Sequence, residues 1–85
     1  MSAELHASAR KHYQRDRLDD HAVLYAAAHV FHSWPLDEED DPRRWLMIGG
    51  DPAGRLLELV ALVFDDGYEL IIHAMKARPQ YLDDL

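Results

Sequence analysis

Apolar and polar residues change their spacing near the middle of the chain, and this change separates two kinds of predicted secondary structure. Up to about residue 31, apolar residues recur every three or four positions, which is the period of a helix with one buried face. Between residues 43 and 75 the period becomes two, which is typical of half-buried strands. The pattern therefore predicts helices followed by a β-sheet.

Two helices are predicted in the first half. Good helix formers at helical spacing predict the first over residues 3–14. After a polar break, Asp19 or Asp20 is suited to cap a second helix over residues 21–31. Trp34-Pro35 predicts the end of this helix, because proline disfavours the α conformation in the residue before it. An exposed loop of five consecutive acids, residues 37–41, is expected next.

Three runs rich in β-forming residues follow, at residues 43–48, 55–64 and 68–75. Asp66-Gly67 predicts a two-residue type I′ turn between the last two runs. The tail, residues 77–85, predicts a short helix with Pro79 in its first turn. The expected fold is a single α+β domain over residues 1–85, with two N-terminal helices packed on a three-stranded antiparallel β-meander and a short C-terminal helix.

The expected hairpin also predicts which strand residues share a face. With Asp66 and Gly67 as the loop, Val60 lies opposite His73 and Glu58 lies opposite Met75. A turn around residues 51–54 then completes a wholly apolar face, which we expect to be the core side: Leu46, Ile48, Leu57, Leu59, Ala61, Val63, Leu70, Ile72 and Ala74. The opposite face is mixed in character: Arg43, Trp45, Met47, Leu56, Glu58, Val60, Leu62, Phe64, Glu69, Ile71, His73 and Met75. A partner protein, the C-terminal tail or a second copy of the chain is expected to cover it.

Composition restricts the classes of function. The 85 residues carry nine basic and sixteen acidic side chains, so the net charge of −7 argues against generic binding to nucleic acid or anionic membranes. Much of the excess lies in residues 37–41, which leaves room for a basic patch elsewhere. With no cysteine, no signal-peptide pattern and no long apolar run, the chain is expected to be a cytoplasmic protein that does not enter a membrane.

One histidine of the mixed face has chemistry-bearing neighbours. Glu58 is a diagonal neighbour of His73, and Arg55, Lys76 and Arg78 lie at the strand ends on the same side. Metal-free cleavage of RNA needs such a set, because protons must move at the 2′-hydroxyl and the leaving oxygen while cations stabilise the phosphorane. A histidine that only forms a structural hydrogen bond is the alternative. No metal-binding or nucleotide-binding motif is present, so neither a metal nor a cofactor is predicted.

Three segments of the second half carry a resemblance to a known family. They read Arg-Trp-Leu-Met-Ile-Gly from Arg44, Gly-Arg-Leu-Leu-Glu-Leu-Val from Gly54, and Ile-Ile-His-Ala-Met-Lys-Ala-Arg from Ile71. In this order they resemble the C-terminal half of BrnT-like toxins of the RelE superfamily. The Gly-Arg arginine of that pattern is matched by Arg55 and its motif lysine by Lys76, whereas His73 replaces the motif serine and Met75 replaces its arginine.

The resemblance implies a RelE-like fold and the toxin of a type II toxin-antitoxin pair. Such a toxin is a metal-independent endoribonuclease that acts on mRNA and is neutralised by a cognate antitoxin protein. On this hypothesis the catalytic residues are His73, Arg55, Lys76 and Arg78, and Tyr81, Arg43 and Glu58 bind the RNA substrate. The alternative is a non-catalytic module that binds protein, or a homodimer, through the mixed sheet face.

Overall fold

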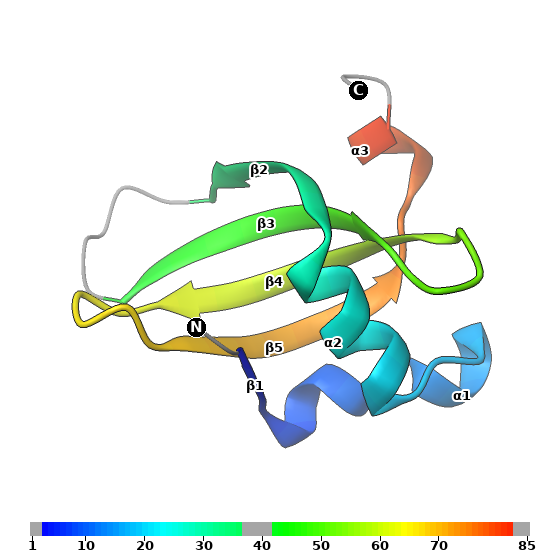
Figure 1. The fold of residues 1–85 in the computed structure, drawn as a ribbon, viewed down its shortest axis with the longest axis horizontal. Helices are drawn as coiled ribbons and strands as arrows, with labels where there is room; N and C mark the ends of the chain where they lie inside the picture. The colour runs from blue at the N-terminus through cyan, green and yellow to red at the C-terminus, as the bar shows by residue number, and fades with distance from the viewer. Residues whose placement is uncertain (1–2, 37–41, 83–85) are drawn as a thin grey trace.

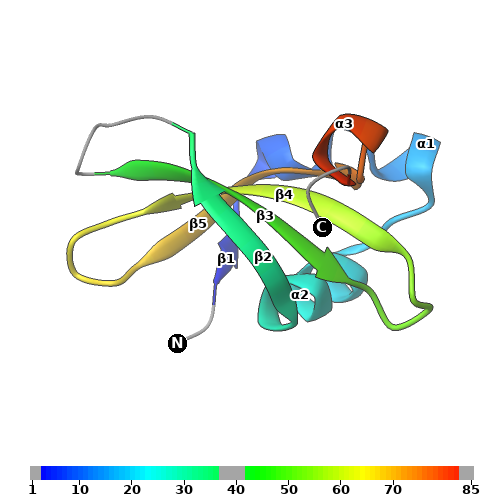
Figure 2. The same cartoon turned by 90° about the horizontal axis from the view of Figure 1, so that it is seen from above.

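The computed structural model describes residues 3–36 and 42–82, which are mostly β-sheet (Figure 1). A single five-stranded sheet has the order β1-β5-β4-β3-β2 and is made of β1 (Glu4–Leu5), β2 (Val30–Pro35), β3 (Arg43–Gly50), β4 (Leu56–Val63) and β5 (Glu69–Lys76). The helical elements are short: the 3₁₀-helix η1 (Ala7–Arg10) and the α-helices α1 (Tyr13–Asp16), α2 (Asp20–Ala28) and α3 (Pro79–Leu82). Figure 2 shows α2 on one side of the sheet and α1 and α3 on the other.

The expected RelE-like fold class is wrong. Strands β3, β4 and β5 form the predicted antiparallel meander, but β1 adds to β5 in parallel and β2 adds to β3 antiparallel. The domain is therefore a five-stranded mixed sheet with short helices, and it is not a pair of helices packed on a three-stranded meander.

The N-terminal segment is broken where one helix over residues 3–14 was expected. The backbone N–H of His6 donates to the carbonyl of Ile71 at 2.9 Å, and Ser8 Oγ donates to the carbonyl of Ile72 at 2.9 Å. The His6 side chain caps η1, because its Nδ1 accepts the N–H of Ser8. These bonds hold the segment against β5. Since a helix of this length is marginal by itself, contacts with the sheet outweigh its helix propensity.

Helix α2 begins as predicted and ends earlier. The N-cap at Asp19 is confirmed, because its Oδ1 accepts the N–H of Ala22 at 2.8 Å. After Ala28 the chain becomes β2, in which half-buried and exposed residues alternate from Val30 to Pro35. Trp34-Pro35 thus lies in a strand, and β2 is at an edge of the sheet, where proline is tolerated. The β-forming character of Val30, Phe31 and Trp34 was the missed signal.

Both hairpins of the meander close through three-residue loops. Phe64 N–H donates to the Tyr68 carbonyl and Gly67 N–H donates to the Phe64 carbonyl. The loop between β3 and β4 has the equivalent pair of bonds: Asp51 N–H donates to the Arg55 carbonyl, and Gly54 N–H donates to the Asp51 carbonyl. Gly67 has φ +90° and Gly54 has φ +85°. Each glycine is thus the left-handed residue that follows a type I turn in three-residue hairpin loops. The predicted two-residue type I′ turn at Asp66-Gly67 is therefore wrong.

The loop lengths decide which sheet face each residue joins. Strand β3 pairs with β4 one residue away from the expected register, so that Met47 lies opposite Leu59 and Ile48 lies opposite Glu58. A one-residue slip exchanges the two faces of a strand. Trp45 and Met47 therefore lie on the α2 side, and Leu46 and Ile48 lie on the other, where the prediction had the reverse.

A β-bulge restores the expected pairing in the second half of β5. Near the loop, Ala61 pairs with Ile71, but the register shifts at the unpaired Ile72 and Val60 then pairs with His73. Glu58 opposite Met75 and Val60 opposite His73 are therefore confirmed. The core between the sheet and the N-terminal segment includes Ala9, Leu18, Val23, Ala26, Met47, Leu57, Leu59, Ala61, Ile71 and Ala74.

The remaining predicted elements lie near the chain end. Helix α3 forms with Pro79 in its first turn, as predicted, and spans Pro79–Leu82. The acidic run at residues 37–41 and the last three residues of the tail lie outside the described residues. No helix in the described ranges has both the length and the apolar composition needed to cross a membrane.

Candidate functional site

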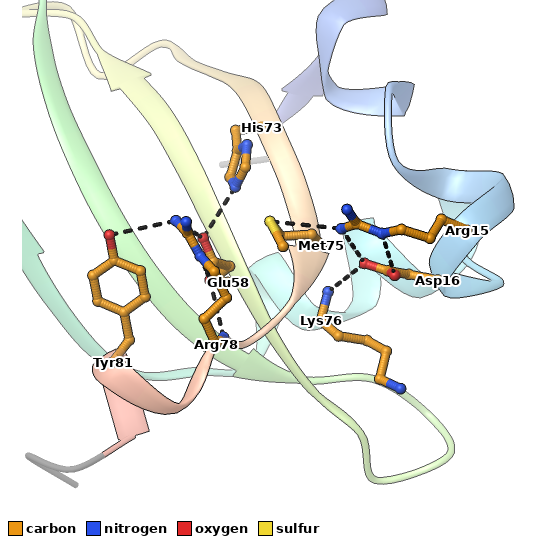
Figure 3. A network of polar contacts seen from close by, with 8 residues as sticks. All are labelled: Arg15, Asp16, Glu58, His73, Met75, Lys76, Arg78 and Tyr81. Carbon is orange, nitrogen blue, oxygen red and sulfur yellow. Dashed lines mark hydrogen bonds and ion pairs between the residues drawn. The ribbon is translucent and has the colours of Figure 1, made fainter.

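A polar network lies on the sheet face that points away from α2. This site face carries Leu46, Ile48, Glu58, Val60 and His73 from the three central strands. Helices α1 and α3 stand on the same side of the sheet (Figure 2). Side chains from both ends of the chain therefore meet strand residues here, as Figure 3 shows.

The centre of the network is the buried carboxylate of Glu58. It has no exposed surface and accepts hydrogen bonds from Arg78 Nε and Nη2, both at 2.9 Å, and from the Arg78 backbone N–H at 3.0 Å. His73 Nε2 lies 3.1 Å from Glu58 Oε2. Burial alone raises the pKa of Glu58, but the bonds from Arg78 and His73 lower it below its ordinary value. The carboxylate is thus ionised and orients one imidazole and one guanidinium.

The bond to Glu58 also sets the chemical state of the His73 ring. Because a carboxylate accepts hydrogen bonds, Nε2 carries the proton that faces it. In the neutral ring Nδ1 is then the acceptor. Since 27% of the His73 side chain is exposed, the ring is held by Glu58 at Nε2 and is partly open to solvent.

Tyr81 of α3 extends the network along the site face. Its hydroxyl lies 3.5 Å from Arg78 Nη2, and the Arg78 guanidinium carbon lies 5.2 Å from the centre of the Tyr81 ring. Trp34 of β2 packs against the same ring, with centroids 6.0 Å apart. An aromatic surface therefore continues from Arg78 to the edge strand β2.

A second arginine approaches from α1. Arg15 Nε and Nη2 donate to the Asp16 carboxylate at 2.8 and 3.1 Å, and Nη2 also lies 3.9 Å from the sulfur of Met75. The hydrogen bond to Asp16 raises the pKa of Arg15, while the nearby Arg78 guanidinium opposes this rise by like-charge repulsion. Guanidiniums are charge-assisted hydrogen-bond donors of the kind that bind phosphate and carboxylate groups.

Asp16 attaches this arginine to the sheet. Its Oδ2 accepts the backbone N–H of Lys76 at 3.0 Å. The hydrogen bond from Arg15 and the one from Lys76 overcome the effect of burial and lower the pKa of Asp16 to about 2. The Lys76 side chain is exposed and extends away from His73 (Figure 3). Lys76 therefore contributes its backbone to the network, and its ammonium group does not reach His73.

His12 is a second histidine next to the network. It lies between η1 and α1, and its ring meets the His73 ring in an edge-to-face contact with centroids 5.8 Å apart. Arg15 and His12 were not predicted as site residues, because both lie in the half expected to be helical, where the sequence gives no sign of contact with β5. The parallel pairing of β1 with β5 brings that half to His73.

Two predicted site residues lie elsewhere. Arg55 donates from Nε to Asp51 Oδ2 at 2.6 Å, and from its two Nη atoms to the carbonyls of Asp16 and Arg17. This guanidinium fastens the loop between β3 and β4 to the end of α1. Arg43 pairs with Val63 at the far end of the meander, three residue pairs from Val60 and about 10 Å along the strand. The structure thus brings His73, Arg78, Glu58 and Tyr81 together and leaves Arg55 and Arg43 outside.

Comparisons with known proteins add no family to this geometry: no protein-family model, no curated protein and no solved structure matches the chain. Within the described ranges, no three histidine or acidic side chains gather in a way that would hold a metal ion. The function is therefore inferred from the site face itself.

Proposed function

We propose that the chain is the toxin of a type II toxin-antitoxin pair and cleaves RNA without a metal ion. The observation that carries the proposal is the buried Glu58 carboxylate, which holds His73 and Arg78 side by side. The similarity of the Gly-Arg and His-Ala-Met-Lys segments to BrnT-like toxins is consistent with it. A cognate antitoxin would neutralise the toxin by covering this face.

The arrangement supplies the parts that phosphoryl transfer requires. An oriented imidazole exchanges a proton with a reacting oxygen, and guanidiniums stabilise the charge on the phosphoryl oxygens. Arg78 fits the second role, since 45% of its side chain is exposed although Glu58 binds its guanidinium. Tyr81 and Trp34 offer ring faces on which unpaired bases stack. Glu58 is buried and acts as a positioning residue, not as a group that touches RNA.

Cleavage of RNA by the purified protein tests this proposal. The wild type, incubated with a single-stranded RNA oligonucleotide in EDTA, is expected to cut it, and expression in a bacterial host is expected to arrest growth. His73→Ala should lower the cleavage rate about 100-fold or more, because a general acid or base contributes about 10²- to 10⁴-fold. His21→Ala is the matched control, since His21 is an exposed histidine on α2. The proposal fails if the wild type neither cuts RNA nor arrests growth, or if His73→Ala is as active as the wild type.

A second candidate is a homodimer formed through β2. This strand is at the edge of the sheet, has no charged residue, and carries Phe31 with 55% of its surface exposed. An uncharged edge strand is open to pairing with another strand. Sedimentation at rising concentration distinguishes this candidate: the wild type would dimerise and Phe31→Lys would stay monomeric. A monomer at all concentrations rejects it.

A further inference from the structure

The ring of His12 has a position that no structural role explains. Its backbone is the N-cap of α1, but the side chain makes no capping hydrogen bond. Within the part of the chain that the structure describes, its ring contact is with His73, at 5.8 Å between centroids and 78° between planes. Two half-buried imidazoles therefore stand side by side on the site face, and Glu58 holds only one of them.

The charges around the two rings differ. Lys11, Arg15 and Asp16 face His12 from its own segment, and His73 faces it from β5. Burial lowers the pKa of His12, the neighbouring Arg15, His73 and Lys11 lower it further, and Asp16 alone opposes them. His12 is thus mainly neutral at pH 7. His73, by contrast, has the ionised Glu58 at Nε2 as a counter-ion for its protonated form.

We propose that His12 is the general base and His73 the general acid of the RNA cleavage proposed above, on which this inference rests. Neutral His12 takes the proton of the 2′-hydroxyl, and the 2′-oxygen forms a bond to phosphorus. The bond between phosphorus and the 5′-oxygen breaks with its electron pair on that oxygen, which receives a proton from the protonated His73. The products are a 2′,3′-cyclic phosphate and a 5′-hydroxyl end. His12 then loses a proton to water and His73 regains one, so the cycle balances.

Arg15 and Arg78 match these roles as phosphate-binding groups. Arg78 shares the Glu58 carboxylate with His73, and the charge of Arg15 acts on both His12 and Arg78. We therefore place the phosphate between the two arginines, next to the two imidazoles. Arg15 and His12 belong to the same short segment, in η1–α1, and Arg78 and His73 follow from β5. Each half of the chain then supplies one proton-transfer group and one phosphate-binding group.

The pH dependence of cleavage tests the assignment. Since the base must be neutral, the wild-type rate should fall as the pH falls through the pKa of His12, which lies below 6.5. His12→Ala should lower the rate about 100-fold or more and remove this acidic limb, and added imidazole should restore part of the rate. His12→Asn, which keeps a polar side chain, should lose the same limb. His21→Ala should leave both the rate and the profile unchanged.

The outcomes separate this inference from the proposed function. A wild type that does not cut RNA contradicts the ribonuclease itself. A wild type that cuts RNA, with His12→Ala and His12→Asn keeping its rate and its acidic limb, overturns the role of His12 and leaves the function standing. Substrate in which the 2′-hydroxyl at the cut is replaced by 2′-O-methyl should not be cleaved, and its cleavage would exclude the transfer to the 2′-oxygen.

Discussion

Arg55 and Arg78 show how one residue type serves two purposes in this protein. Each guanidinium binds a buried carboxylate, Asp51 for Arg55 and Glu58 for Arg78. Arg55 also donates to two backbone carbonyls at the end of α1, so its donors are used within the fold. Arg78 shares the Glu58 carboxylate with His73, lies next to Tyr81, and has 45% of its side chain exposed. The surroundings of each arginine, and not its place in a motif, assign its role.

Replacing Arg55 should therefore affect stability and not chemistry. Arg55→Ala leaves the buried Asp51 without its charged partner, and we expect the free energy of unfolding in urea to fall by about 2 to 3 kcal/mol. Arg10→Ala is the control, because the Arg10–Asp20 pair is nearly half exposed on both sides and such pairs contribute little to stability. Cleavage per folded molecule should stay within about twofold of wild type. A large loss of cleavage with unchanged stability would place Arg55 in the active site.

At the scale of elements, the sequence predicted the meander and the pairing around the site but not the whole sheet. The pair of Val60 with His73 was predicted correctly through two errors that cancel. The loop before β5 is one residue longer than the Asp-Gly signal suggests, and the bulge at Ile72 takes up that extra residue. The β3–β4 pairing contains no such bulge, so its register differs by one residue from the predicted one along the whole strand. The residues of β3 therefore lie on the faces opposite to those predicted. A bulge is fixed by packing, which local patterns do not show.

The two added strands were missed for a related reason. β1 has only two residues and gains its order from β5 rather than from its own sequence. The pairing of β1 with β5 holds the following segment close to β5, where His12 contacts His73 and Arg15 contacts Met75. The sequence could therefore predict the site residues of β4, β5 and α3, whereas those near α1 depend on a contact between segments about sixty residues apart.

Gly49 sets how closely α2 approaches the sheet. A Cβ atom at this position would overlap the backbone carbonyl oxygen of Ala26, whereas one at Gly50 would meet nothing within 4 Å. Gly49→Ala should push α2 from β3 and cost about 1 to 3 kcal/mol. Thermal unfolding followed by circular dichroism should show a midpoint lower by about 10 °C for Gly49→Ala, with Gly50→Ala close to wild type. Equal midpoints for the two variants would mean that α2 does not contact Gly49 as described.

At the scale of the whole molecule, the net charge of −7 and the proposed RNA substrate must be reconciled. Long-range repulsion slows the approach of RNA, so binding must depend on a few short-range contacts. Arg78 shares Glu58 with His73, Arg15 lies against Met75 of the same strand, and each arginine is kept in place by a carboxylate. The protein would thus bind RNA at one phosphate and its flanking bases, not along an extended basic groove.

This model predicts a weak dependence of RNA binding on salt. For single strands the logarithm of the affinity falls with the logarithm of salt concentration by about 0.7 per phosphate contacted, so one phosphate held by two arginines predicts a slope of about −0.7. A 2′-O-methyl oligonucleotide, which lacks the attacking hydroxyl, allows the measurement by fluorescence anisotropy without cleavage. Arg15→Ala and Arg78→Ala should each weaken binding and bring the slope closer to zero. Arg10→Ala should leave it unchanged, because that guanidinium is turned toward Asp20. A slope several times steeper, or one that neither site variant changes, would show that RNA binds the protein at another surface.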